Sequence, residues 1–111
     1  MIPINENERI PFDDKDGVRY FFRALTGENE YKFYDILTKD DEKKPIEERR
    51  KVLDEAIDFV LLGWEPVGDV KMSAFPDNGK PSGCFGKVNK DRLLSIALDV
   101  NNIGNVDSKN S

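Results

Sequence analysis

The sequence has no histidine and a single cysteine, Cys84, among its 111 residues. Without an imidazole, the chain lacks the usual general base near neutral pH, the usual zinc ligand and the middle member of a catalytic triad. Cys84 has no histidine to activate it, so we expect a spare thiol rather than a nucleophile. A lone cysteine forms no disulfide within the chain, which is typical of reducing compartments. We therefore expect a non-enzymatic, cytoplasmic protein.

Long apolar runs are also absent. No stretch approaches the roughly 20 residues that cross a bilayer, and the first nine residues lack the basic region and apolar core of a signal peptide. We therefore expect neither membrane insertion nor secretion. Apolar residues make up 38% of the chain and charged residues 35%. This balance predicts a soluble globular domain with a small core and a heavily charged surface.

The net charge of -5 comes entirely from the first part of the chain. Residues 1–63 carry 16 acidic and 11 basic side chains, whereas residues 64–111 carry six of each. An acidic surface repels phosphate backbones, so direct binding to nucleic acid is disfavoured. The carboxylate clusters at residues 13–16 and 40–42 lack the spacing of a calcium loop. We expect these clusters to be solvated turns, and we expect neither a metal site nor a cofactor.

Local patterns predict an α+β fold with a single domain over residues 1–104 and a disordered polar tail over residues 105–111. An extended segment ending near Phe12, a turn over residues 13–17 and a strand over residues 18–25 predict an N-terminal hairpin. Pro11 in the first of these segments is typical of an edge strand.

Two helices are expected next. The first begins at Thr26, whose hydroxyl would cap it, and ends near Thr38. The second begins at Pro45, which suits a first turn because its missing N–H has no partner there. Aliphatic residues at helical spacing make this second helix the core helix, and Gly63 is expected to end it in a left-handed cap.

Residues 63–88 are expected to form a flexible loop or hairpin before a C-terminal helix. Residues 63–86 hold five of the eight glycines and three of the six prolines, which excludes a long helix and suits a hairpin or flap. The last helix is predicted from Lys90 to about Asn102, with Asn89 as its cap and Gly104 as a terminator.

Three large aromatic residues, Trp64, Phe75 and Phe85, lie in or beside this glycine-rich and proline-rich segment. They either fold back to cover the core or remain accessible as anchors for a protein partner, because aromatic side chains dominate binding hot spots. If they are anchors, Phe75→Ala and Phe85→Ala should weaken partner binding and leave the melting temperature nearly unchanged.

Short motifs follow one another along most of the chain. They are Ile2-Pro3-Ile4-Asn5, Arg23-Ala24-Leu25-Thr26-Gly27, Leu62-Gly63-Trp64, Asp77-Asn78-Gly79 and Leu93-Leu94. Their order resembles that of small proteins from tailed-phage and prophage structural operons, a group similar to tail-assembly chaperones and related morphogenesis proteins. The resemblance implies a non-enzymatic factor that binds a phage structural protein, in the host cytoplasm or in the virion. It assigns no functional residue.

The alternative function is that of an acidic inhibitor that mimics nucleic acid and binds a host defence protein or another nucleic-acid-binding protein. This function requires a continuous negative strip along the second predicted helix. The candidate residues are Glu47, Glu48, Asp54, Glu55 and Asp58. Basic residues at positions 49–51 interrupt the strip, so we rank this function second.

Overall fold

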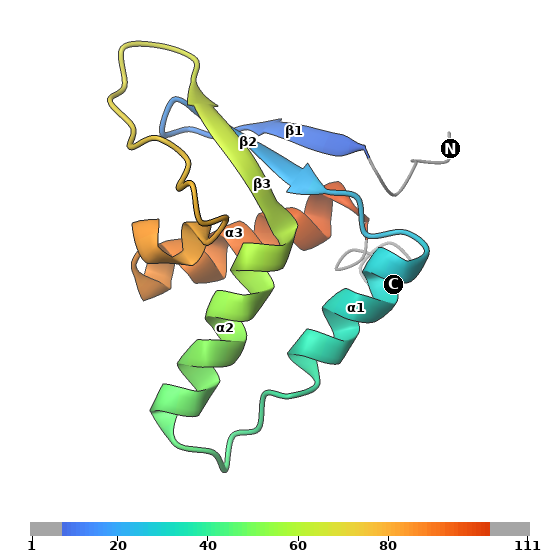
Figure 1. The fold of residues 1–111 in the computed structure, drawn as a ribbon. Helices are drawn as coiled ribbons and strands as arrows, with labels where there is room; N and C mark the ends of the chain where they lie inside the picture. The colour runs from blue at the N-terminus through green and yellow to red at the C-terminus, as the bar shows by residue number, and fades with distance from the viewer. Residues whose placement is uncertain (1–7, 103–111) are drawn as a thin grey trace, which may run out of the picture.

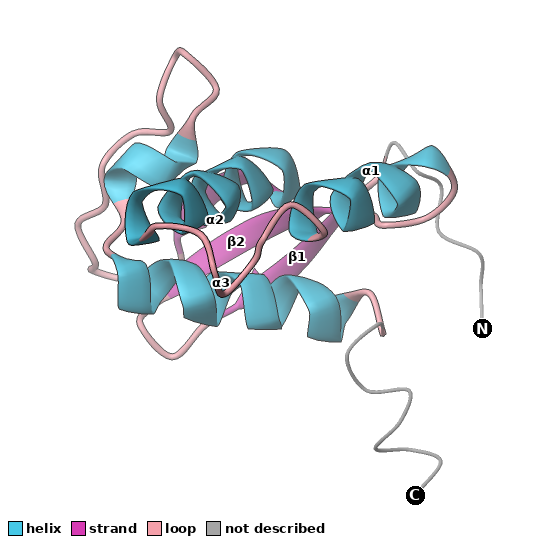
Figure 2. Ribbon diagram, turned by 90° about the horizontal axis from the view of Figure 1, so that it is seen from below, coloured by secondary structure: helices cyan, strands magenta, loops and turns pink. Residues whose placement is uncertain are grey.

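Three helices cover one face of a small antiparallel sheet (Figures 1 and 2). The structure is a computed structural model that describes residues 8–102. The α+β fold and its N-terminal hairpin agree with the sequence prediction. In chain order the elements are β1 (Arg9–Asp13), β2 (Val18–Arg23), α1 (Glu28–Leu37), α2 (Ile46–Val60), β3 (Leu61–Pro66), a short 3₁₀ helix η1 (Pro81–Cys84) and α3 (Lys87–Val100).

The turn between β1 and β2 depends on Gly17. Its φ of 83° lies in the left-handed region that favours glycine. A Cβ atom at this position would also lie only 2.6 Å from Cγ2 of Val70, which belongs to the segment after β3. The predicted turn is therefore confirmed, and its glycine is required both for the turn and for the approach of a distant segment.

Pro11 lies on the outer edge of β1. Within residues 8–102 the sheet has the order β1-β2-β3, so β1 is an edge strand. At one end of the β1–β2 pair the N–H of Asp14 donates to the carbonyl of Val18 at 3.0 Å. At the other end the N–H of Ala24 donates to the carbonyl of Glu8 at 3.3 Å. Even-numbered residues of β1 therefore bond to β2, and the nitrogen of Pro11 points away from the sheet. A proline at this position removes a donor that an added strand would need.

Pro66 has the same role on the opposite edge. The N–H of Val67 donates to the carbonyl of Gly17 at 2.9 Å, and Pro66 lies opposite Val18 in the β2–β3 register. The alternation of bonds then directs the nitrogen of Pro66 away from β2. Both edges of the sheet therefore lack a donor that strand addition would use.

The transition from α2 to β3 differs from the prediction. α2 begins directly after Pro45, as expected, but it ends at Val60 and passes without a loop into β3. Gly63 pairs with Phe21 inside the sheet, and its φ is not positive. The expected left-handed cap at Gly63 was wrong, because pairing with β2 extends the chain at the point where local glycine chemistry favours a helix end.

The other helix boundaries shift by a few residues. Gly27 occupies the capping position that was predicted for Thr26, and α1 ends just before Thr38, as expected. α3 begins three residues before the predicted start at Lys90, with Gly86 at its cap, so Asn89 lies within the first turn. The predicted terminator Gly104 and the predicted tail lie outside the described residues, as does the motif at residues 2–5.

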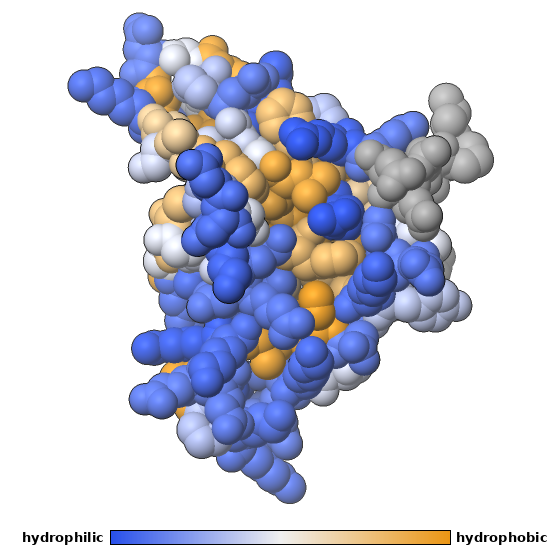
Figure 3. Space-filling view, viewed as in Figure 1, coloured by the Kyte–Doolittle hydropathy of each residue, from blue (hydrophilic) through white to orange (hydrophobic). Residues whose placement is uncertain are grey.

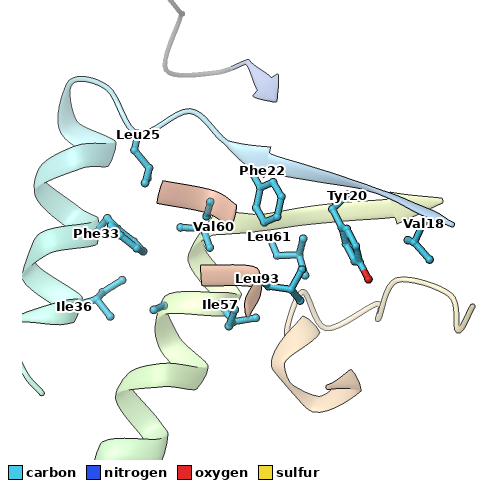
Figure 4. Close-up of a cluster of buried hydrophobic side chains, with 12 residues drawn as sticks. Val18, Tyr20, Phe22, Leu25, Phe33, Ile36, Ile57, Val60, Leu61 and Leu93 are labelled. Carbon is cyan, nitrogen blue, oxygen red and sulfur yellow. The ribbon is translucent and has the colours of Figure 1, made fainter. Parts of the chain in front are cut away.

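The core lies between the sheet and the helices (Figure 4). Burial alternates along β2, so that every second side chain faces the helices. Figure 3 shows polar side chains over most of the face seen in Figure 1, with apolar side chains gathered where α2 passes into β3. The labelled core residues are Val18, Tyr20, Phe22, Leu25, Phe33, Ile36, Ile57, Val60, Leu61 and Leu93.

Asn101 connects the end of α3 to the segment between β2 and α1. Its Oδ1 accepts a hydrogen bond from the N–H of buried Leu25 at 2.8 Å. Its Nδ2 donates to the carbonyl of Arg23 at 3.2 Å and to that of Ala97 at 2.8 Å. One side chain therefore satisfies backbone groups from both ends of the chain.

Candidate functional site

The structure brings Trp64, Phe75 and Phe85 into one aromatic cluster. The ring centroids of Trp64 and Phe75 are 5.0 Å apart with an interplanar angle of 60°, and those of Trp64 and Phe85 are 5.2 Å apart with an angle of 80°. These are edge-to-face contacts, in which the positive edge of one ring meets the negative face of another. Trp64 is thus the central member of the cluster.

Strand pairing and one hydrogen bond place the tryptophan. Trp64 lies opposite Tyr20 in the β2–β3 register, so both side chains project from the helix-covered face of the sheet. The indole Nε1 of Trp64 donates to the backbone carbonyl of Ser73 at 2.6 Å. This bond ties the irregular segment after β3 to the sheet and brings Phe75 against the indole.

The three aromatic side chains are half-buried. Trp64 and Phe85 pack against the core cluster, and the Phe85 ring also lies 6.4 Å from the Tyr20 ring. Phe75 contacts Trp64 and is not among the residues that pack against the core cluster. The aromatic cluster therefore covers one end of the core and also keeps part of each ring at the surface. Their predicted role as partner anchors remains a prediction.

The segment that carries Phe75 was predicted to be a loop or a hairpin, and residues 67–80 form a loop. It leaves β3 as an irregular loop and returns to η1 and the start of α3 (Figure 1). Val67 and Val70 in this segment are exposed, and Met72 packs against the core. Apolar side chains thus continue along the segment on either side of the Trp64–Ser73 hydrogen bond.

Carboxylates of the hairpin turn are engaged by the rest of the protein. The hydroxyl of Tyr20 donates to Oδ2 of Asp16 at 2.7 Å, and Arg92 of α3 forms ion pairs with Asp14 and Asp16. Burial, reinforced by the hydrogen bond to Asp16, raises the pKa of Tyr20 well above its usual value. This arrangement joins the turn to α3 beside the aromatic cluster.

The second acidic cluster is also linked to a cation. The Nε of Arg49 in α2 donates a hydrogen bond to Oδ1 of Asp40 at 2.9 Å. This hydrogen bond to the guanidinium lowers the pKa of the Asp40 carboxyl. Within residues 8–102, no group of three or more cysteine, aspartate and glutamate side chains is arranged to hold a metal ion.

Three of the five acidic residues proposed for a negative strip on α2 have partners elsewhere in the protein. Asp54 pairs with Lys90 of α3 at 2.6 Å, and Glu55 pairs with Lys39 at 3.4 Å. Asp58 accepts two hydrogen bonds from Ser82 of η1, one from its backbone N–H at 2.8 Å and one from its hydroxyl at 3.1 Å. Asp54, Glu55 and Asp58 are therefore each held by a residue of another segment, Lys90, Lys39 and Ser82 respectively.

Sequence reasoning found the three aromatic residues but missed two residues that position them. Tyr20 could have been found, because alternation along the second strand places it on the buried face with Val18 and Phe22. Ser73 could not, because its backbone carbonyl is the acceptor and carries no side-chain signal. Cys84 is exposed, directly before Phe85.

No helix in the described part of the chain is long and apolar enough to cross a membrane. No protein-family model, curated protein or solved structure matches the chain.

Proposed function

We propose that this protein is a non-enzymatic factor that binds a phage structural protein during virion assembly, most directly assembly of the tail. The observation that carries the proposal is the half-buried aromatic cluster at the end of β3. Accessible tryptophan and aromatic residues in a packed group are typical binding hot spots. The phage context rests on the resemblance of the sequence motifs.

The cluster is organised before a partner arrives. Edge-to-face contacts and the Trp64–Ser73 hydrogen bond hold the rings in place, so little side-chain entropy is lost on binding. Apolar side chains of a partner would complete the burial of the exposed ring surfaces. A partner is not expected to add a strand, because Pro11 and Pro66 remove edge donors.

The geometry favours this function over that of an acidic inhibitor. An inhibitor that mimics nucleic acid needs free carboxylates in a continuous array. Asp54 and Glu55 are instead paired with lysines, and Asp58 holds η1. An assembly factor that binds through apolar contacts requires no such array.

An affinity pull-down from cells that carry the protein's own operon tests the proposal, with bound proteins identified by mass spectrometry at low and high salt. A tail or head component that remains bound at high salt is the expected result, because apolar contacts are screened little by ions. Recovery of only a host nuclease that salt releases would refute the proposal in favour of the acidic inhibitor.

Fluorescence of the recovered complex then locates the contact. Trp64 is the only tryptophan, so its emission should shift to shorter wavelength as the partner covers the cluster. Phe75→Ala should weaken binding by about tenfold, which is typical of a hot-spot residue. Val88→Ala is the matched control, because Val88 is 80% exposed on α3 and lies outside the aromatic cluster. Equal affinities for wild type and Phe75→Ala would exclude the cluster as the contact.

A further inference from the structure

A groove of about 400 Å³ lies between the first halves of α2 and α3, and no residue of the aromatic cluster lines it. Figure 2 shows both helices on the side of the molecule opposite the sheet. The groove is lined from α2 by Ile46, Arg49, Arg50, Val52 and Leu53 and from α3 by Lys87, Asp91 and Leu94. Ile46, Arg50 and Leu53 of α2 have the spacing i, i+4, i+7, and so do the three residues of α3, so each helix presents a face to the groove.

The floor of the groove is apolar. Leu53 and Leu94 are half-buried, and Leu37 at the end of α1 closes one side. Ile46 in the first turn of α2 is 54% exposed, although it is a large aliphatic residue. Contact with a second apolar surface would remove these side chains from water, which is the main favourable contribution to association.

The free charge at the groove is positive, although the protein as a whole is acidic. Lys87 pairs with Asp91 at 2.8 Å and Arg49 pairs with Asp40 at 2.9 Å, so these charges are balanced. Arg50 lines the groove, and none of the ion pairs within residues 8–102 includes it. The first turn of α3 contains no acidic residue, so the positive end of its helix dipole adds to this field.

We infer that this groove binds an amphipathic helix of a partner protein, with an apolar stripe against Leu53 and Leu94 and a carboxylate paired with Arg50. Two helix faces that flank an apolar floor are typical of helix-in-groove recognition. Arg50 supplies charge complementarity, since a guanidinium binds a carboxylate through two hydrogen bonds. The inference does not depend on the aromatic cluster, and it gives the protein a second surface for a second segment of a partner.

A fluorescein-labelled synthetic helix tests this inference by fluorescence anisotropy. The probe carries leucines at i, i+3, i+4 and i+7 and glutamates on the flanks, and a matched peptide carries lysines in place of the glutamates. The glutamate peptide should bind about tenfold more tightly than the lysine peptide, because only it can pair with Arg50. Equal affinity of the two peptides, or no binding of either, would overturn the inference.

Variants of the groove give the second test. Arg50→Glu and Ile46→Ser should each weaken binding of the glutamate peptide by about fivefold or more. Lys51→Glu and Val88→Ser are the matched controls, because both residues are exposed and neither lines the groove. Circular dichroism checks that the variants are folded. Control variants that weaken binding as much as the groove variants would refute the assignment.

Two further measurements test whether a second copy of this chain occupies the groove and whether the aromatic cluster contributes to peptide binding. If sedimentation shows that the wild type self-associates and Arg50→Glu is monomeric, the groove binds a second copy of this chain and the inference is wrong. Phe75→Ala should leave binding of the glutamate peptide unchanged, because the aromatic cluster does not line the groove. A loss of peptide binding in Phe75→Ala would contradict the independence of the two surfaces.

Discussion

Replacement of Phe85 by alanine should destabilise the protein more than replacement of Phe75. Phe85 packs against the core and makes aromatic contacts with both Tyr20 and Trp64, whereas Phe75 makes one such contact, with Trp64. The sequence alone suggested that both substitutions would leave the melting temperature nearly unchanged. The structure replaces that expectation with a difference between the two positions.

The size of the difference follows from burial and ring contacts. Truncation of a fully buried phenylalanine costs about 3–5 kcal/mol, and an aromatic pair adds about 0.5–1.5 kcal/mol to the stability gained from buried area. Phe85 is half-buried with two ring contacts, so Phe85→Ala should cost ~2–3 kcal/mol. Phe75→Ala should cost about 1 kcal/mol, because it loses one ring contact and less core packing.

Thermal unfolding followed by far-ultraviolet circular dichroism measures both effects. For a domain of this size about 1 kcal/mol corresponds to roughly 4 °C, so Phe85→Ala should lower the melting temperature by ~8–12 °C and Phe75→Ala by ~4 °C. Val88→Ala serves as the exposed control. Equal decreases for Phe75→Ala and Phe85→Ala, or a decrease below about 4 °C for Phe85→Ala, would refute the view that Phe85 belongs to the core.

Four other substitutions test particular positions. Asn101→Ala should lower the free energy of unfolding, measured in urea, by about 1–3 kcal/mol, because the N–H of buried Leu25 loses its acceptor. Asn89→Ala should change stability by less than about 0.5 kcal/mol, since Asn89 does not cap α3; a cost as large as that of Asn101→Ala would contradict this. Gly17→Ala should lower the free energy of unfolding by ~2–3 kcal/mol through its left-handed backbone and a collision with the following segment, and an unchanged thermal midpoint would show that the turn relaxes freely. The wild type should lose stability above about pH 10, where tyrosine ionises in the unfolded chain before it ionises at Tyr20, whose folded pKa is raised. Tyr20→Phe should flatten this alkaline decline in urea titrations, and an identical slope in both proteins would exclude Tyr20 as its source.

Local patterns were sufficient for the hairpin and for α2. The aspartates and Gly17 predict a turn from their own backbone preferences, and the strand after it alternates as a half-covered strand should. Pro45 and the aliphatic stripe behind it predict α2 in the same way. These features depend on residues within a few positions of one another, so the sequence contains all the information they need.

The third strand could not be obtained from the same reasoning. Leu61–Pro66 follows a strong helix and contains Gly63, so local chemistry favours a helix end and a loop. The segment becomes a strand because β2, about 40 residues earlier, offers an unpaired edge. The start of α3 also differs from the prediction, because Gly86 after η1 occupies the capping position that was expected for Asn89.

By itself the sequence determined the chemistry that this chain can offer. It excludes histidine-based catalysis and intrachain disulfides, and it supplies Trp64, Phe75 and Phe85 beside the glycine-rich and proline-rich segment and an excess of acidic residues. Only the tertiary structure decided that Trp64, Phe75 and Phe85 meet, and that Arg50 borders an apolar groove. Both arrangements require segments that are distant in sequence to pack at particular angles. Such packing depends on strand register and helix crossing, which side-chain periodicity within a single element does not specify.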